Sequence, residues 1–391
     1  MAKDRYLSSF IYKDLNDKMV FIAGPRQVGK TTLARDIMKK YFSKISYFLW
    51  DNRDDRKNII SYRFPADYDL IIFDEIHKYK NWKNHIKGIY DKLKDKYKFI
   101  VTGSSRLDIF RKSGDSLQGR YHYYRLHPFS MREINEINQY YNTEVLKELK
   151  FLKYNKDYFD ILFKFGGFPE PMIKQSEVFL RRWHNEKLER LFREDIRDVE
   201  KINDINSMKL LSDILPEKAS GILSLNSLRE DLLVSHKAVK RWVEILESFY
   251  YIFRIYPYLT DKYKSIKKEP KLYLWDWSEV EDESKRFENM VASHLLKYVN
   301  FLYDNLGYKA ELNFLRDMEK REVDFLVSID KKPWFSVEVK LNETDVSKNL
   351  IYYKEKLKIP FNYQVIKKSG VDIYQNDIRI ISADKFFTGL C

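Results

Sequence analysis

A short loop near the start of the sequence carries the residues with the clearest chemical potential. Residues 24–31 read G-P-R-Q-V-G-K-T and match the phosphate-binding pattern G-x-x-x-x-G-K-[ST] at every fixed position. The two glycines let the backbone curl so that successive N–H groups face phosphate oxygens. We expect Lys30 to contact the terminal phosphates and the Thr31 hydroxyl to ligate Mg²⁺. The predicted nucleotide-binding residues are Gly24, Pro25, Arg26, Gln27, Val28, Gly29, Lys30, Thr31 and Thr32.

Two neighbouring acids, Asp74 and Glu75, follow the apolar residues 70–73. The carboxyl ends of parallel strands form the ligand-binding edge of open α/β sheets. We therefore predict that Asp74 holds Mg²⁺ and that Glu75 acts as the general base on the attacking water. The alternative interpretation is that both acids merely cap a strand.

Two further groups could act during phosphoryl transfer. The apolar residues 99–102 precede Gly-Ser-Ser, and the Ser104 hydroxyl could orient the attacking water. Arg120 is predicted to stabilise transition-state charge, either within its own chain or from a neighbouring subunit. An ordinary surface arginine is the alternative interpretation of Arg120.

A second group of chemistry-bearing residues lies near the C-terminal end. Glu338 and Lys340 are two positions apart in a strand-like segment, so they lie on one face, and Asp324 from the preceding strand-like segment can reach that face. Carboxylates that hold a divalent cation, with a lysine that activates water or steadies charge, make a phosphodiesterase site. Asp324 and Glu338 are the predicted metal ligands, and Glu288 could add a further acid. The alternatives are an ordinary ion pair and a retained fold without cleavage activity.

Strands and helices must bring these residues together. In the first third of the chain, short apolar runs alternate with stretches of helical periodicity, which predicts a parallel α/β sheet. Strands are expected over 19–23, 45–49, 70–73 and 99–102, and a helix over 31–41 directly after the loop. Alternating strands and helices resume after the lysine-rich residues 262–270.

Between these regions, the sequence predicts a helix-turn-helix. Residues 225–233 and 235–247 form two helix-like stretches, and an aromatic hairpin is expected over 249–258. The second helix would bury Val239, Trp242, Val243 and Leu246, and would expose His236, Lys237, Lys240 and Arg241 as a DNA-reading helix requires. The competing interpretation is that these helices serve only in packing between domains.

Composition and charge limit the classes of protein. Lys and Arg number 71 against 58 Asp and Glu, and almost all of this basic excess lies within residues 1–135. The presumed DNA-facing regions are therefore near neutral, which makes nucleic-acid binding a hypothesis. The single cysteine, Cys391, excludes an intrachain disulfide framework. Because no apolar run approaches the length of a membrane span and no signal peptide is recognisable, we expect a soluble, cytoplasmic protein without a membrane partner.

The combination of these motifs resembles a known family. The phosphate loop, Asp74-Glu75, residues 102–105, Gly119-Arg120, the Gly-Gly-Phe-Pro-Glu-Pro segment at 166–171 and the two C-terminal motifs are similar to prokaryotic AAA-type ATPases with a C-terminal PD-(D/E)XK nuclease-like region. The resemblance implies ATP and Mg²⁺ as cofactors, since the Asn-Lys-x-Asp guanine signal is absent.

The expected fold is therefore an α/β P-loop sheet followed by a helical linker, a winged-helix-like domain and an α/β restriction-endonuclease-like domain. We predict these four parts at residues 1–135, 136–204, 205–261 and 262–391. The predicted function is an ATPase coupled to a nuclease-like nucleic-acid-processing module. The alternatives are an ATP-dependent switch that binds DNA or a protein with an inactive nuclease-like domain, and a signalling ATPase without nucleic acid. DNA is the preferred nucleic-acid partner over RNA, and assembly into a homo-oligomer would allow Arg120 to act between subunits.

Overall fold

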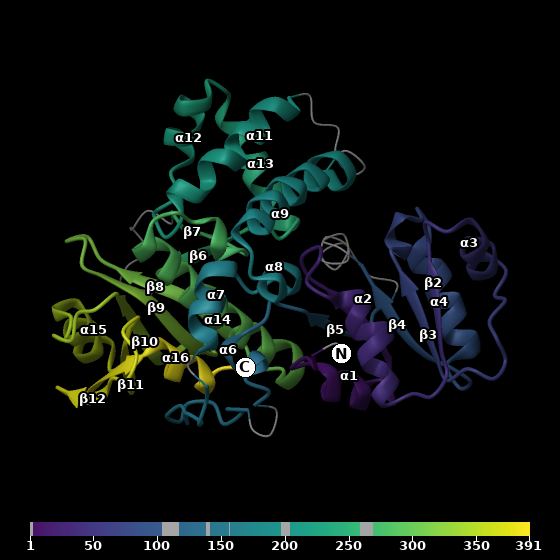
Figure 1. Ribbon diagram of the computed structural model, residues 1–391, viewed down its shortest axis with the longest axis horizontal. Coiled ribbons are helices and arrows are strands. Elements are labelled where there is room, and N and C mark those ends of the chain that lie inside the picture. Colours follow the sequence, from purple (N-terminus) through teal and green to yellow (C-terminus); the bar gives the residue numbers. More distant parts are fainter. Residues whose placement is uncertain (1–2, 104–116, 138–140, 156, 197–203, 259–268) are drawn as a thin grey trace. The chain divides into compact units, whose positions relative to one another are not determined.

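The computed structural model describes residues 3–103, 117–137, 141–155, 157–196, 204–258 and 269–391. The chain divides into two compact units (Figure 1). Unit 1 contains Met1–Pro128 and Ser248–Tyr250, and unit 2 contains Phe129–Glu247 and Tyr251–Cys391. The predicted four-part division is finer than these units and stays a prediction.

Unit 1 is built on a five-stranded sheet in which every neighbouring pair of strands is parallel. The order is β2-β3-β4-β1-β5, so the two chain-adjacent acids and the phosphate loop follow strands separated only by β4. The four predicted strands are confirmed. The strands are β1 (Met19–Ala23), β2 (Ile45–Leu49), β3 (Leu70–Asp74), β4 (Lys98–Thr102) and β5 (Tyr121–Arg125).

Helical segments connect β1 to β2, β2 to β3 and β3 to β4, as parallel pairing requires. The segment after the phosphate loop is helical over 30–40, as predicted, with the α-helical start α2 (Lys30–Thr32), a π-helical turn at Leu33–Ile37 and a 3₁₀ turn at Met38–Lys40. Strands β1 and β3 are buried at every position, which explains their continuous apolar runs. The other helices of this unit are α1 (Ser8–Asp14), α3 (Arg53–Ile60) and α4 (Trp82–Leu93).

Unit 2 contains an eight-stranded mixed sheet in the order β12-β13-β11-β10-β9-β8-β6-β7. The long helix α14 (Glu283–Leu306) packs on β7, β8, β9 and β10, and α15 (Lys348–Leu357) packs on β9 and β10 (Figure 1). The strands are β6 (Ile252–Pro257), β7 (Lys271–Leu274), β8 (Ala310–Arg316), β9 (Glu322–Ile329), β10 (Lys332–Lys340), β11 (Phe361–Ile366), β12 (Asp372–Gln375) and β13 (Ile378–Ser382).

Two helices of unit 2, α12 (Leu225–Leu232) and α13 (His236–Ser248), lie where the sequence predicted a helix-turn-helix, whose DNA-reading role stays a prediction. In α13 the four predicted core residues are buried, and His236, Lys237, Lys240 and Arg241 are exposed. The strand after it differs from the expected wing, because β6 pairs with both β7 and β8 and so belongs to the large sheet. The other helices are α6 (Met131–Ile134), α7 (Tyr158–Phe165), α8 (Pro169–Lys174), α9 (Glu177–Arg190), α11 (Ile205–Ile214) and α16 (Ala383–Phe386).

Gly166 explains part of the predicted Gly-Gly-Phe-Pro-Glu-Pro turn. It ends α7 with φ 75°, and a Cβ atom there would lie 2.6 Å from Asp276 Oδ1 and 3.0 Å from Ser278 Oγ. A side chain at this position would thus meet both an unfavourable backbone conformation and a steric clash. Pro169 then starts α8 at a position that tolerates proline.

Candidate functional site

The phosphate loop leaves β1 at its carboxyl end. Gly24 has φ 143°, and a Cβ atom there would lie 2.4 Å from the Leu126 carbonyl oxygen, so only glycine fits. Gly29 has φ 99° and immediately precedes α2. The first glycine allows close approach of the loop to the segment that follows β5, and the second places the loop at a helix N-terminus, where phosphates bind.

Lys30 lies inside this loop. Its side chain is buried, and its ammonium donates hydrogen bonds to the carbonyl oxygens of Gly24 and Pro25 at 3.0 and 2.8 Å. The loop therefore curls around a fixed positive charge, which is the arrangement that can receive a nucleotide's β- and γ-phosphates.

Asp74 is the polar centre of the strand edge. Its Oδ2 atom accepts hydrogen bonds from the Thr31 hydroxyl at 2.9 Å and the Tyr47 hydroxyl at 2.7 Å, and its Oδ1 atom accepts one from the Thr102 hydroxyl at 2.5 Å. The structure thus brings the two predicted Mg²⁺ ligands, Thr31 and Asp74, together. Their hydroxyl and carboxylate oxygens are a donor set that fits Mg²⁺.

Tyr47 was not singled out in the sequence, and Thr102 was named only as part of the motif at 102–105, although both lie in predicted strands. Tyr47 comes from the middle of β2 and Thr102 ends β4, so both flank β3 in the sheet. Burial, together with the neighbouring Asp74 carboxylate, raises the pKa of Tyr47, so its hydroxyl remains a hydrogen-bond donor. Only the order of the strands in the sheet places these two hydroxyl groups beside Asp74, and the sequence does not reveal that order.

Glu75 follows Asp74 in a left-handed backbone conformation with φ 56°. Burial and the adjacent Asp74 carboxylate raise the pKa of Glu75, and Lys30, Lys78 and Arg26 partly oppose that rise. Its Oε2 atom lies 3.4 Å from Nε2 of the buried His77. A carboxylate with a raised pKa beside a phosphate loop is suited to accept a proton from water near neutral pH.

Arg120 does not reach this edge of the sheet. It precedes β5 at its amino end, where its backbone carbonyl accepts a hydrogen bond from Met19 N–H, at the start of β1. Asp91 holds its guanidinium through contacts of 2.7 and 3.0 Å. Arg120 lies at the amino end of β1 and β5, whereas the phosphate loop follows the carboxyl end of β1. Action of Arg120 on a phosphate bound in its own chain was therefore a wrong prediction. Action from a neighbouring subunit stays a prediction, and Ser104 lies outside the described residues.

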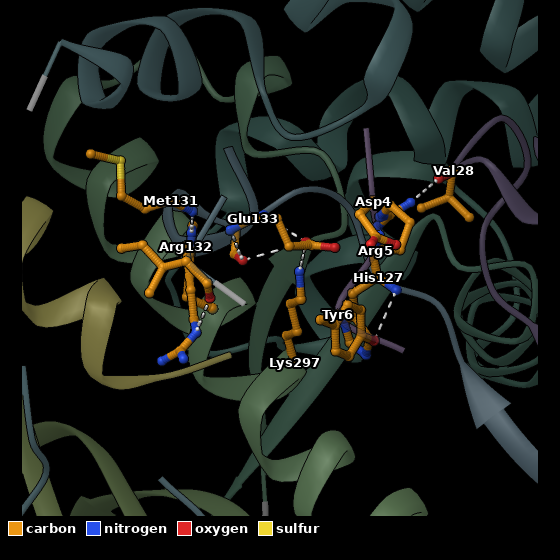
Figure 2. Close-up of polar contacts among 12 residues, drawn as sticks. Asp4, Arg5, Tyr6, Val28, His127, Met131, Arg132, Glu133 and Lys297 are labelled. Atoms are coloured by element: carbon orange, nitrogen blue, oxygen red, sulfur yellow. Dashed lines mark hydrogen bonds and ion pairs between the residues drawn. The ribbon is translucent and has the colours of Figure 1, made fainter. Parts of the chain in front are cut away.

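Arg5 is a loop contact that sequence reasoning missed. Figure 2 shows its guanidinium next to Val28, and the hydrogen bond to the Val28 carbonyl oxygen is 2.8 Å. A second bond reaches the His127 carbonyl oxygen at 2.5 Å, and Arg5 is buried. Arg5 thus ties the phosphate loop to the segment after β5. No pattern around residue 5 indicated this role.

The C-terminal carboxylates gather on β9 and β10. Asp324 Oδ2 accepts a hydrogen bond from Val339 N–H at 2.9 Å, and Glu338 Oε1 lies 3.1 Å from Lys340 Nζ. Glu338 is 5% exposed, and its Oε2 atom has no hydrogen-bond partner among the described residues. Burial and the nearby Asp324 raise the pKa of Glu338 to about 8, and Lys340 acts against the rise.

A buried lysine on β7, absent from the sequence analysis, completes this cluster. Lys271 Nζ lies 3.1 Å from Glu288 Oε1, 2.7 Å from Glu322 Oε1 and 3.1 Å from Asp324 Oδ1. Tyr273 donates a hydrogen bond of 2.8 Å to Glu288. Burial and Asp324 raise the pKa of Glu288 to about 7, against the effect of Lys271. The structure therefore brings Glu288, Asp324, Glu338 and Lys340 together as expected, and adds Lys271 and Glu322.

A third polar group lies elsewhere in unit 2. Ligand atoms of His184, Asp276 and Glu279 lie within 4.8 Å of one another, close enough for a metal ion. Lys187 forms ion pairs with both acids, at 3.1 Å from Asp276 Oδ2. Although burial acts against it, the pKa of Asp276 is lowered by Lys187 and His184. The lysine thus supplies the positive charge in this group.

Comparison with known protein families assigns a described family only to the N-terminal region. Residues 16–135 match the AAA domain family, whereas residues 155–279 and 284–386 match two domains of unknown function, DUF8612 and DUF4143. The C-terminal matches carry no assigned activity, so the nuclease-like interpretation remains a proposal. No helix in the described part of the chain combines the length and apolar character needed to cross a membrane.

Relatives and solved structures are distant. An uncharacterized protein of Methanocaldococcus jannaschii, MJ1544, is 24% identical over 94% of this chain and 88% of its own length. A second one, MJ1637, is 25% identical over 66% of this chain and 61% of its own length. A RuvB variant of Thermotoga maritima has a TM-score of 0.32 at 18% identity, covering 63% of this chain and 87% of that one. A Bacteroides Pif1 bound to ssDNA has a TM-score of 0.24 at 12% identity, covering 100% and 94%.

The family match and the geometry of the site fall on the same part of the chain. The glycine-lined loop, the enclosed Lys30 and the Thr31–Asp74 contact occupy the region that matches the AAA family. Together they support a nucleotide-binding ATPase of the AAA type in residues 16–135 of this chain.

Proposed function

We propose that the protein is a Mg²⁺-dependent ATPase whose site is the phosphate loop and the carboxyl edge of β3. The observation that carries the proposal is the 2.9 Å hydrogen bond between the Thr31 hydroxyl and Asp74. These are the two residues that share a nucleotide-bound Mg²⁺ in P-loop enzymes. The ion would neutralise charge on the β- and γ-phosphates when bound.

Each residue then has a defined task in hydrolysis. The backbone of residues 24–32 holds the phosphates, and Lys30 exchanges its two loop carbonyls for phosphate oxygens. Thr31 and Asp74 hold the ion, and Glu75 accepts the proton of the attacking water. Ser104 as a water-orienting hydroxyl and Arg120 as an arginine supplied by a second subunit complete the proposal.

Lys30→Ala tests the binding step. Loss of a buried, charge-assisted contact to phosphate removes about 1.5–3 kcal/mol, which corresponds to roughly 10- to 100-fold weaker ATP binding. Titration with a fluorescent ATP analogue measures the change, and Lys39→Ala, which alters an exposed lysine 15 residues after the loop start, is the matched control. Equal affinity of Lys30→Ala and wild type would contradict the proposed site.

A second activity is favoured by the C-terminal carboxylates. We propose that Asp324 and Glu338 hold a divalent cation and that the Lys340 ammonium steadies negative charge during phosphodiester cleavage of nucleic acid, DNA in preference to RNA. The supporting observation is the buried Glu338 Oε2 atom without a hydrogen-bond partner in the described part of the chain, because a buried carboxylate oxygen needs a partner. In the competing proposal the C-terminal carboxylate centre does not cleave nucleic acid, and ATP controls binding of DNA through the exposed residues of α13.

A cleavage assay separates these two proposals. With Mg²⁺ or Mn²⁺ and single- or double-stranded DNA, wild type should cut, and Asp324→Ala and Lys340→Ala should cut about 10²–10³-fold more slowly, as expected for loss of a group that stabilises transition-state charge. Asp330→Asn, in the exposed turn between β9 and β10, is the control. Salt-sensitive DNA binding without cleavage would support the switch. Cleavage that survives both alanine substitutions would exclude this site as its source.

A further inference from the structure

Lys271 is the most enclosed charge of the C-terminal cluster. Its side chain is 3% exposed, and its ammonium contacts three carboxylates on two elements: Glu288 on α14, and Glu322 and Asp324 on β9. Removal of an ammonium group from water is unfavourable unless opposite charges surround it. Three carboxylates within 3.1 Å give Lys271 the surroundings that a bound cation would have.

The cluster has two sides that share Asp324. On the Lys271 side, Glu288 also accepts a hydrogen bond from Tyr273, and Glu322 also pairs with Arg316 at 2.6 Å. On the other side, Lys340 is 32% exposed and contacts Glu338, whose Oε2 atom has no partner in the described residues. The first side is already filled by a cation, and the second has an unused buried oxygen.

The net charge of the cluster also favours one bound ion, on the Glu338 side. When all four carboxylates are deprotonated, as binding of a cation requires, Glu288, Glu322, Asp324 and Glu338 face the three cations Lys271, Arg316 and Lys340, for a net charge of −1 before the ion is added. One divalent ion would bring the cluster to +1, which favours an anionic phosphodiester. A second would bring it to +3 and would sit against the Lys271 ammonium, and like charges at such distances repel strongly.

We propose that Lys271 is a built-in cation that takes the place of a second divalent ion. The C-terminal centre then accepts a single divalent ion, on the side of Glu338. This inference rests on the carboxylate centre of the proposed function, but it concerns how many ions bind and does not require cleavage.

Counting bound Mn²⁺ tests the inference. Electron paramagnetic resonance of free Mn²⁺, measured with the full-length chain without nucleotide, gives the number of ions bound per chain. Glu338→Gln should bind one ion fewer than wild type. Lys271→Met should bind one ion more than wild type, and adding Glu288→Gln to Lys271→Met should remove the extra ion.

The outcomes distinguish the two proposals. If Glu338→Gln loses no ion, the proposed metal centre is wrong whatever Lys271 does. If Glu338→Gln loses one ion and Lys271→Met gains none, only the role of Lys271 is overturned. Loss of two ions in Glu338→Gln would also overturn it, and that comparison needs no variant at the buried lysine.

Thermal unfolding provides a second readout if Lys271→Met folds poorly. Without its lysine the cluster carries −2, so the unfolding midpoint in EDTA should fall by several degrees, and Mn²⁺ should restore most of the loss because it binds the folded state. Lys367→Met, which removes a partly exposed lysine paired with Glu283, should show no such restoration. Equal response of the two variants to Mn²⁺ would contradict the inference.

Discussion

Replacement of Glu75 by Gln should slow ATP hydrolysis by about 10²–10⁴-fold and leave ATP binding unchanged, because the amide keeps the shape of the side chain but cannot accept a proton. Burial and Asp74 raise the pKa of Glu75, so the native carboxylate is a stronger base than an exposed glutamate. Asp74 is less suited to this role, since three hydroxyl groups already donate to its two oxygens. The expected signature is normal affinity with lost turnover.

Two measurements on the same preparation check this expectation. Phosphate release at saturating ATP gives turnover, and titration with a fluorescent ATP analogue gives affinity. Asp69→Asn is the matched control, because Asp69 is an exposed acid just before the opposite end of β3. Turnover of Glu75→Gln within a few-fold of wild type would assign the base to another group. A parallel loss of affinity would mean that Glu75 helps to bind the nucleotide.

The sequence predicted the parts of the fold whose signals are local. The strand at 19–23 and the strand before Glu75 are each marked by a continuous apolar run that ends in glycine or acid, the loop at 24–31 is marked by its motif, and the structure has all three. On β10, the two-residue spacing of Glu338 and Lys340 placed both on one face, and their side chains meet. These predictions needed only chain periodicity and a motif.

The groups that were missed depend on which strands are neighbours. Tyr47 reaches Asp74 because β2 lies beside β3, and Lys271 reaches Asp324 although 53 residues separate them. Arg120 was predicted to act at the phosphate loop, but it lies at the amino end of β5. The direction of the strands in the sheet sets this position, and the motif around Arg120 does not show it. Sheet order and direction arise from packing of the whole core, which a single sequence does not display.

The second large effect is expected at the contact between α6 and α14. Figure 2 shows Lys297 reaching Glu133, and both side chains of this ion pair are 2% exposed. Glu133 also accepts a hydrogen bond of 3.1 Å from Ser130 N–H, as part of the capping box of α6. Lys297→Met would leave the Glu133 carboxylate buried without this ammonium, and breaking one side of a buried pair costs about 3–5 kcal/mol.

Urea unfolding measures this loss, and a double-mutant cycle shows that it belongs to the pair. Adding Glu133→Gln to Lys297→Met removes the buried negative charge but keeps an oxygen for Ser130 N–H, so the double variant should be more stable than Lys297→Met alone. The cost of Lys297→Met should therefore shrink when Glu133 is already neutral. If the two substitutions are instead additive, or if Lys297→Met costs less than about 1 kcal/mol, the destabilisation would come from lost packing of the lysine stem and not from an uncompensated charge.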